Sequence, residues 1–238
     1  MDYLYGTDIV YDGEPNGTER HSNMISAYHS TGNIASVHWS LLYHTISTAN
    51  TIIDRLPVSE VSEEQKTIAE AKARFFRGFA YRTLTYLYGG VPLLLTEVIE
   101  PKFDYVRASK EEVLRQALTD VEFAAAHLPS LSSVQDGEVS NAAAYHLLSE
   151  LYLATAQYQK AVDAATTVID DPATGLMYTR FGSRANELPG DVYWDLFRKN
   201  NQNRSSGNTE GIWVIQIETD TPGGSGSLTA KDQTYTLE

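Results

Sequence analysis

The longest regular pattern of apolar and polar positions lies between residues 68 and 92, in the stretch IAEAKARFFRGFAYRTLTYLYGGVP. Apolar residues recur there at helical spacing in two neighbouring rows. One row is Ile68, Ala71, Phe75, Phe79 and Tyr86, and the other is Ala69, Ala73, Phe76, Ala80, Leu84 and Leu87. Two adjacent rows make a face wider than a surface helix needs, so we predict a central helix that is packed on more than one side. The remaining polar row is narrow and consists of Glu70, Arg74, Arg77, Tyr81, Thr85 and Tyr88.

Glycines mark both the interior and the end of this predicted helix. Gly78 lies in its middle, where glycine costs about 1 kcal/mol relative to alanine, and this favours the close approach of a neighbouring backbone. Gly89 and Gly90 supply a cap, and Pro92 prevents the helix from resuming. We predict that Arg74 and Arg77 pair with Glu70 and with backbone carbonyls rather than with a ligand.

Two further helices are indicated on either side of the central one. The first runs from about His38 to Leu56, where Pro57 ends it, and Asn50 beside its apolar face is predicted to hydrogen-bond a neighbouring segment. The second follows an extended Leu93–Leu95 run and ends before Pro129. Capping boxes, Ser62 with Gln65 and Ser109 with Glu112, predict the starts of the central helix and of this later one.

A tetratricopeptide-like pattern occupies residues 140–172, SNAAAYHLLSELYLATAQYQKAVDAATTVIDDP. The first helix of such a pair needs the sizes large, large, small and large, which Tyr145, Leu148, Ser149 and Tyr152 provide. In the second helix the residues that pack back are Ala161, Ala165 and Val168. One such unit cannot bury its own faces, so the earlier helices are interpreted as degenerate units stacked beside it.

These patterns define the predicted fold and its organisation. We expect a mostly α, tetratricopeptide-like α-α superhelix with long irregular loops, forming a single domain over residues 1–238. Residues 1–36 are predicted as loop, 37–173 as helical repeats and 174–238 as an irregular segment. A minor β element is predicted at 212–219, IWVIQIET, from its alternation. Both ends are interpreted as cuts in a longer chain.

Composition narrows the functional classes. The chain has 31 acidic and 18 basic side chains, a formal charge of −13, which argues against nucleic acid as a partner. There is no cysteine, so disulfides, thiolate metal sites and a cysteine nucleophile are excluded for these residues. No apolar run approaches the ~20 residues of a membrane span, and Met1 is not followed by the basic and apolar regions of a signal peptide.

Motifs for catalysis or metal binding are weak. No histidine pair has the HExxH spacing, and GGSGS at 223–227 does not satisfy the nucleophile-elbow pattern. The carboxylates at helix starts are explained by the helix dipole. Asp12, Glu14, Asn16 and Gly17 copy the first half of a calcium loop, but Asn23 stands where a bidentate glutamate is needed. We therefore expect no metal, no cofactor and no enzymatic activity.

Several segments, taken in order, carry a resemblance to a known family. The stretch EAKARFFRGFAYRTLTYLYGGVPLL resembles the signature of SusD/RagB nutrient-binding lipoproteins, and it is the most specific of them. Weaker matches are LYGTDIV, WSLLYHTISTANTIIDRL, DGEVSNAAAYHLLSELYLATAQYQKAVDAATTVID and GDVYWDLFRKNNQNRSSGNTEGIWVIQIE. The chain resembles only the N-terminal portion of the family, whose members are longer and begin with a lipidated cysteine.

This resemblance implies a surface-exposed lipoprotein of the outer membrane. Such a protein captures a glycan or another nutrient and passes it to a SusC-like TonB-dependent transporter. Two alternatives remain open from the residues alone: a tetratricopeptide-type adaptor that binds a peptide, and, with less support, a glycoside hydrolase.

Ligand contacts are expected in the loops over the helical scaffold, and the loop Tyr11–Trp39 is the best placed of these. Carboxylate and amide hydrogen bonds combined with aromatic stacking are the usual means of carbohydrate capture. The candidate ligand-binding residues are therefore Asp12, Asn16, Arg20, Tyr28, His29 and Trp39. Trp39 lies on an apolar helix face, where packing is the competing role, and Trp194 and Trp213, in segments predicted as extended, share that ambiguity.

Overall fold

The computed structural model describes residues 33–216, with side chains from Ser36 onward. Its α-helices are α2 (Asn33–Arg55), α3 (Glu63–Tyr88), α4 (Lys110–His127), α5 (Asn141–Ala154), α6 (Tyr158–Ile169) and the short α7 (Val192–Leu196). Single 3-10 turns are η1 (Leu56–Val58), η2 (Leu131–Ser133) and η3 (Arg204–Ser206).

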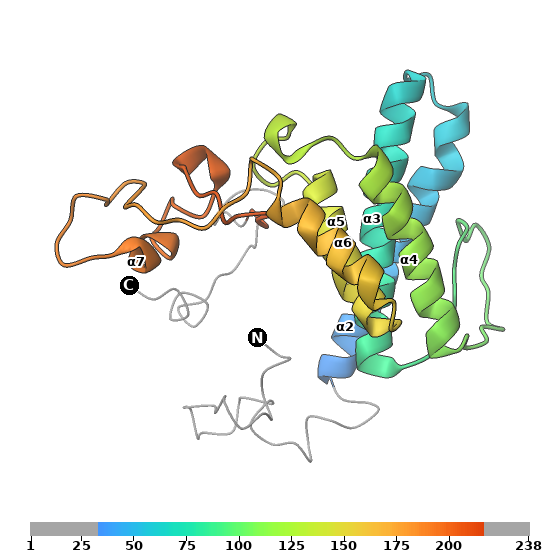
Figure 1. Ribbon diagram of the computed structural model, residues 1–238. Helices are drawn as coiled ribbons and strands as arrows, with labels where there is room; N and C mark the ends of the chain where they lie inside the picture. Colours follow the sequence, from blue (N-terminus) through green and yellow to red (C-terminus); the bar gives the residue numbers. More distant parts are fainter. Residues whose placement is uncertain (1–32, 217–238) are drawn as a thin grey trace, which may run out of the picture.

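From α2 to α5, each helix packs against the next one along the chain, so that α6 ends the series. Figure 1 shows them as an array of long helices, from which residues 170–216, here called the arm, project to one side. Packing between sequence neighbours is typical of helical repeats. The predicted mostly α, tetratricopeptide-like fold is confirmed.

The helix starts were predicted well by their capping boxes. Ser62 accepts a hydrogen bond from the Gln65 amide, and Ser109 accepts one from the Glu112 amide, with the reciprocal bonds present in both cases. The bounds differ from the prediction at the first helix, because α2 begins at Asn33 and not near His38. Its first turn was assigned to the preceding loop because Gly, Asn, Ser and Thr are frequent up to residue 36, although Ile34, Val37 and Leu41 keep helical spacing.

The middle of α3 lies directly against α4, as Gly78 indicated. A Cβ atom at Gly78 would lie 2.5 Å from Val121 Cγ2 and 3.1 Å from the carbonyl oxygen of Ala117. The predicted close approach of a neighbouring backbone is confirmed, since a side chain at this position would push the two helices apart.

The faces of α3 differ in part from the prediction. Tyr81 was assigned to the polar row but is fully buried, while Tyr86 and Leu87 of the apolar rows are 49% and 38% exposed. The reason is tertiary: the extended Leu93–Leu95 run crosses this side of α3. The Tyr81 hydroxyl donates to the Leu94 carbonyl at 2.8 Å and accepts from the Leu94 amide at 2.6 Å. Burial raises the pKa of Tyr81 to about 12.

A buried polar cluster joins α2, α3 and α4. The Arg77 guanidinium donates to both oxygens of Asp120, at 2.8 and 2.6 Å. It also donates to Asn50 Oδ1 at 2.8 Å and to the Leu95 carbonyl at 3.2 Å. Asn50 in turn donates to the Leu94 carbonyl at 2.8 Å, which confirms its predicted bond to a neighbouring segment. The predicted Arg74–Glu70 pair is also present, whereas Arg77 takes Asp120 as its carboxylate partner.

The repeat-like pair α5 and α6 closes the array. Ala161 and Val168 of α6 are buried against neighbouring helices, as predicted, whereas the third buried position is Ala164 and the predicted Ala165 is only partly buried. The Tyr152 hydroxyl donates to Glu122 Oε1 at 2.7 Å and so joins α5 to α4.

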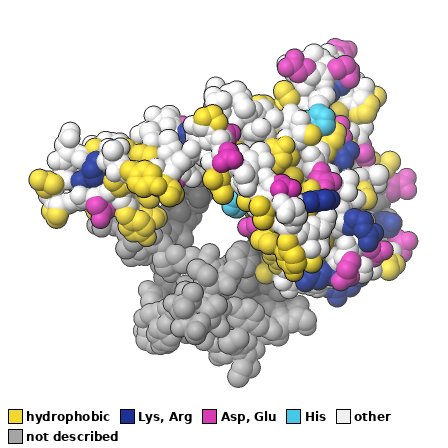
Figure 2. Space-filling model, viewed as in Figure 1, with side chains coloured by type: hydrophobic (Ala, Val, Ile, Leu, Met, Phe, Trp, Pro, Cys, Tyr) yellow, Lys and Arg dark blue, Asp and Glu magenta, His cyan; other side chains and the backbone are white. Residues whose placement is uncertain are grey.

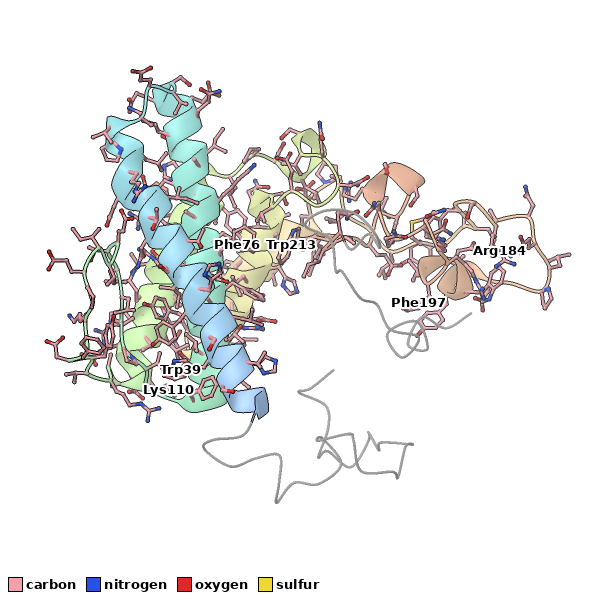
Figure 3. All side chains as sticks on the ribbon, turned by 180° about the vertical axis from the view of Figure 1, so that it is seen from behind. Trp39, Phe76, Lys110, Arg184, Phe197 and Trp213 are labelled. Atoms are coloured by element: carbon pink, nitrogen blue, oxygen red, sulfur yellow. The ribbon has the colours of Figure 1, made fainter. Side chains whose placement is uncertain are left out.

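The arm is irregular apart from α7 and η3. The predicted β element at 212–219 is not present in its described part: Ile212–Gln216 forms no strand pairing. The alternation instead reflects the anchoring of one side chain. Trp213 donates from Nε1 to the Gly137 carbonyl at 3.2 Å, and its ring lies 5.6 Å from that of Phe75 and 5.9 Å from that of Phe76 (Figure 3). The division into three segments stays a prediction.

Candidate functional site

A buried carboxylate organises the outer part of the arm. Asp195 is fully buried and receives hydrogen bonds from Arg180, at 2.5 and 3.0 Å, and from the Phe181 amide at 3.1 Å. The bond from Arg180 is the main reason why the pKa of Asp195 lies below its usual range. Arg180 also donates to the carbonyls of Arg184, Glu187 and Gly190. One ion pair therefore holds the loop 180–190 against α7.

Asn201 holds the other side of the same loop. This fully buried amide donates to the carbonyls of Asp195 and Phe181, at 3.0 and 3.3 Å, and accepts from the Ser183 amide at 3.1 Å. Gly182 has φ of 75° and passes so close that a Cβ there would lie 2.1 Å from Asn201 Oδ1. Only glycine adopts this conformation and leaves this space at no cost.

The short helix α7 presents two aromatic rings to the solvent. Asp191 begins the helix by accepting a hydrogen bond from the Trp194 amide at 2.7 Å. Tyr193 and Phe197 then lie four residues apart, on the same side of one helical turn. They are 71% and 56% exposed, and their ring centroids are 4.9 Å apart. Together they form a small exposed apolar patch, which is a candidate contact for a ligand or a partner.

Trp194 is partly buried and is surrounded by guanidinium groups. Arg198 lies over its ring with Cζ 3.5 Å from the centroid, and Arg184 and Arg180 lie at 5.3 and 5.5 Å. Trp194 was predicted in an extended segment, and that prediction is wrong. The Asp191 cap, three residues before it, produces a helical turn at this point.

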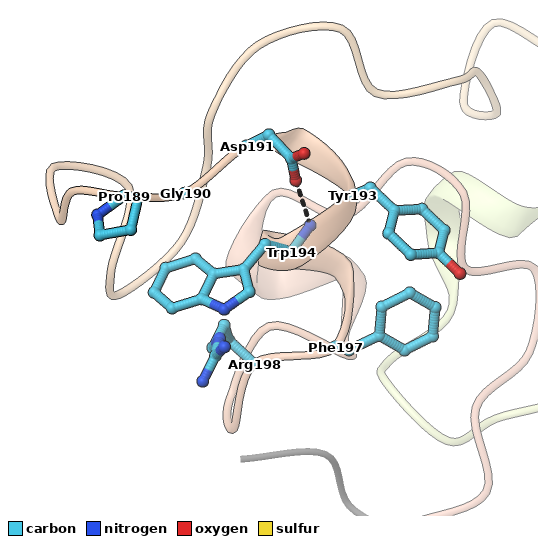
Figure 4. Close-up of a pocket in the computed structure, with 7 residues that line it drawn as sticks. All are labelled: Pro189, Gly190, Asp191, Tyr193, Trp194, Phe197 and Arg198. Carbon is cyan, nitrogen blue, oxygen red and sulfur yellow. Dashed lines mark hydrogen bonds between the residues drawn. The ribbon is translucent and has the colours of Figure 1, made fainter.

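An open hollow of about 620 Å³ lies beside α7. Its lining residues are Pro189, Gly190, Asp191, Tyr193, Trp194, Phe197 and Arg198 (Figure 4). Aromatic faces, a hydroxyl, a carboxylate and a guanidinium thus converge on one solvent-open site. Apolar ring faces suit the C–H face of a sugar, and the polar groups suit its hydroxyls. In the space-filling view, hydrophobic side chains also gather over the arm (Figure 2).

Most of the predicted ligand residues lie outside the described part of the chain: Asp12, Asn16, Arg20, Tyr28 and His29. The possible calcium loop at 12–23 lies there too. Trp39 is described and lies on α2, partly buried, with its ring 4.9 Å from that of Tyr43 and 5.1 Å from that of Tyr88. It is far from α7 (Figure 3). Its role toward a ligand stays a prediction.

Sequence analysis missed Tyr193, Phe197 and Arg198. One signal was present, because an aspartate cap followed by aromatic residues four apart predicts one exposed helical turn. The hollow itself had no sequence signal, since its walls depend on Asp195 and Asn201 folding the loop 180–190 back.

A second hollow, about 390 Å³, lies between α2 and α3 and is mostly apolar. It is lined by His44, Thr45, Thr48, Ala49, Ile52, Ala69, Lys72, Ala73 and Phe76. The hydroxyls of Thr45 and Thr48 donate to helix carbonyls and Lys72 pairs with Glu138, so this hollow is the weaker candidate.

Between residues 33 and 216, no three or more His, Asp or Glu side chains gather in a way that would hold a metal ion. None of the helices described there has the length and apolarity needed to cross a bilayer.

Comparison with known proteins identifies the family. A SusD-like family model, described as starch-binding and associating with the outer membrane, matches residues 13–153. The chain belongs to this SusD-like family, and this confirms the resemblance found in the sequence.

Individual proteins similar to this chain are also SusD-like. SusD-like protein P25 of Formosa agariphila is 23% identical over 210 residues, which cover 80% of this chain and 40% of the relative. A SusD-like protein of Bacteroides fragilis is 23% identical, with a TM-score of 0.64 over 76% of this chain and 33% of that one. A laminarin-binding SusD-like protein is 28% identical, with a TM-score of 0.55 over 60% of this chain and 33% of that one. The chain thus spans well under half the length of these relatives.

Acidification is expected to loosen the arm before the helices. The Arg180 bond depresses the Asp195 pKa, so the stabilisation is fully present above the unfolded-state value of about 3.9 and is lost as pH falls through the lower folded-state value. As the pH is lowered below about 4, near-UV circular dichroism should fall earlier than the helical signal at 222 nm. In an Asp195→Asn variant this early step should be absent. An equal early step in that variant would exclude Asp195 as its source.

Proposed function

We propose that this chain is part of a cell-surface protein that binds a glycan without cleaving it. It delivers the bound oligosaccharide to a TonB-dependent outer-membrane transporter. The observation that carries the proposal is the exposed pair Tyr193 and Phe197 beside the α7 hollow. Membership of a starch-binding family and similarity to a laminarin-binding protein support it.

The arrangement suits binding and not turnover. The acidic residues nearest the hollow are already engaged: Asp195 is bonded to Arg180, and Asp191 caps α7. A glycosidase needs two carboxyl groups that face each other across the scissile bond. The described hollow is lined by one carboxylate, Asp191.

Removal of both exposed rings is expected to weaken oligosaccharide binding. For Tyr193→Ala/Phe197→Ala we expect at least about a tenfold loss of affinity, since aromatic residues dominate such contacts. Isothermal titration against a panel of neutral and anionic oligosaccharides, including a laminari-oligosaccharide, measures this effect. Tyr158→Ala on α6, a residue 66% exposed and outside the arm, is the matched control.

The same titrated samples test the absence of cleavage. Chromatography after prolonged incubation should recover the oligosaccharide intact. Wild-type affinity in the double variant would contradict the α7 site, and product formation would contradict the non-catalytic function. For delivery, the full-length lipoprotein should co-purify with a SusC-like barrel from outer membranes; its recovery in the soluble fraction alone would contradict the proposed location.

A further inference from the structure

We infer that the α7 hollow takes an anionic sugar and that Arg198 binds its charged group. This inference rests on the proposed glycan-binding function and adds the class of glycan. The charged group is a carboxylate or a sulfate ester on the ring that stacks at Tyr193 and Phe197.

Arg198 differs from the other two arginines around Trp194. Arg180 is bonded to Asp195 at 2.5 and 3.0 Å, and Arg184 lies 2.6 Å from Glu187. Arg198 lines the hollow and feels the charges of Glu187 and Asp195 through space, but it forms no ion pair with a carboxylate in the described part of the chain. Its Nε is buried and has no hydrogen-bond partner there. A guanidinium with unused donors at the wall of an open site is suited to receive an anion.

Stacking fixes the orientation of this guanidinium. Its Cζ lies 3.5 Å from the centre of the Trp194 ring, a distance at which the cation contacts the aromatic face. The planar group is therefore held before any ligand arrives, which reduces the entropy lost on binding. A planar guanidinium can donate two parallel hydrogen bonds to a carboxylate or to two oxygens of a sulfate.

Local charge favours the same class of ligand. The whole chain has a formal charge of −13, yet residues 180–204 contain five basic and three acidic side chains. Those three acids are each engaged: Glu187 with Arg184, Asp195 with Arg180, and Asp191 as the cap of α7. Figure 4 shows Asp191 and Arg198 on opposite sides of the Trp194 ring, so the one carboxylate of the lining is kept away from the cation.

The test compares three oligosaccharides of similar length by isothermal titration. They are an oligogalacturonate, a sulfated carrageenan oligosaccharide and a neutral laminari-oligosaccharide. At least one anionic oligosaccharide should bind at least about tenfold more tightly than the neutral one, with a preference that weakens as salt rises. Comparison of the oligogalacturonate with the carrageenan oligosaccharide shows whether the favoured group is a carboxylate or a sulfate.

Variants assign the preference to one residue. Arg198→Met keeps a long side chain over Trp194 but removes the charge, so the ratio of anionic to neutral affinity should fall by about tenfold. Lys199→Met removes the same charge from the exposed neighbouring residue and should retain the preference. Arg198→Lys should retain part of it, because lysine keeps the charge but not the fork of donors.

The outcomes separate this inference from the proposed function. Anionic binding no tighter than neutral binding in the wild type, or an Arg198→Met variant of unchanged preference, overturns the inference and leaves glycan binding intact. If no oligosaccharide in the panel binds, both the proposed function and this inference are overturned. The comparison of anionic with neutral oligosaccharides in the wild type needs no variant. It therefore tests the inference even if Arg198→Met disturbs the arm.

Discussion

Replacing Arg77 with methionine is expected to destabilise the protein by about 3–5 kcal/mol, the largest loss we predict for a single side chain. Its side chain is 4% exposed and that of its partner Asp120 is fully buried. The variant leaves Asp120 buried in the core with only the longer contact from Arg74, at 3.4 Å, to compensate its charge. It also removes the donors to Asn50 and to the Leu95 carbonyl. Urea unfolding followed at 222 nm gives the change in the free energy of unfolding.

Two further variants separate the buried charge from the lost packing. Arg77→Met/Asp120→Leu should recover much of the loss, because removal of both partners leaves no unpaired charge. Lys66→Met removes a lysine whose partner Glu63 is 88% exposed, so its effect should stay within about 1 kcal/mol. A double variant as unstable as the single one would show that the loss comes from packing and not from the stranded carboxylate.

Replacing Gly182 with alanine is expected to release the arm locally and to abolish binding at α7. The left-handed conformation costs alanine about 1–2 kcal/mol. The new Cβ would also lie 2.1 Å from Asn201 Oδ1, so the Asn201 side chain must move and lose hydrogen bonds. Leaving this buried amide unsatisfied costs roughly 1–3 kcal/mol. The arm has few buried contacts to offset this loss. Hydrogen exchange at the Phe181 and Ser183 amides should accelerate, while exchange in α3 stays slow.

Gly175 provides the matched control for that substitution. It lies in the same arm, and a Cβ there would meet nothing within 4 Å. Gly175→Ala should therefore leave both hydrogen exchange and oligosaccharide affinity unchanged. Wild-type affinity in Gly182→Ala would mean that the Gly182–Asn201 contact does not position the site.

The helical scaffold was largely predictable because its determinants are local. The Ser62 and Ser109 capping boxes act within four residues, and the apolar rows act within a few turns. Gly78 predicted a close helix contact without naming the helix that makes it. The errors on α3 came from a long-range partner: Tyr81 is buried because Leu94, distant in sequence, passes over it.

The candidate site was not predictable in the same way. Its predicted residues 12–29 lie outside the described part of the chain, and the α7 hollow was missed. The hollow is formed by contacts such as Asn201 with Ser183 and Arg180 with Asp195, which join residues 15 to 18 positions apart within an irregular loop. No periodicity encodes such contacts, because neither helical nor strand spacing applies there.

The sequence by itself determined the family, the order of the helices and their caps, because these depend on residue spacing along the chain. The tertiary structure alone decided which carboxylate Arg77 meets and which face of α3 is buried. It also decided that Tyr193, Phe197 and Arg198 surround one hollow. Each of these depends on the relative placement of segments distant in sequence, and that placement is fixed only when the segments pack.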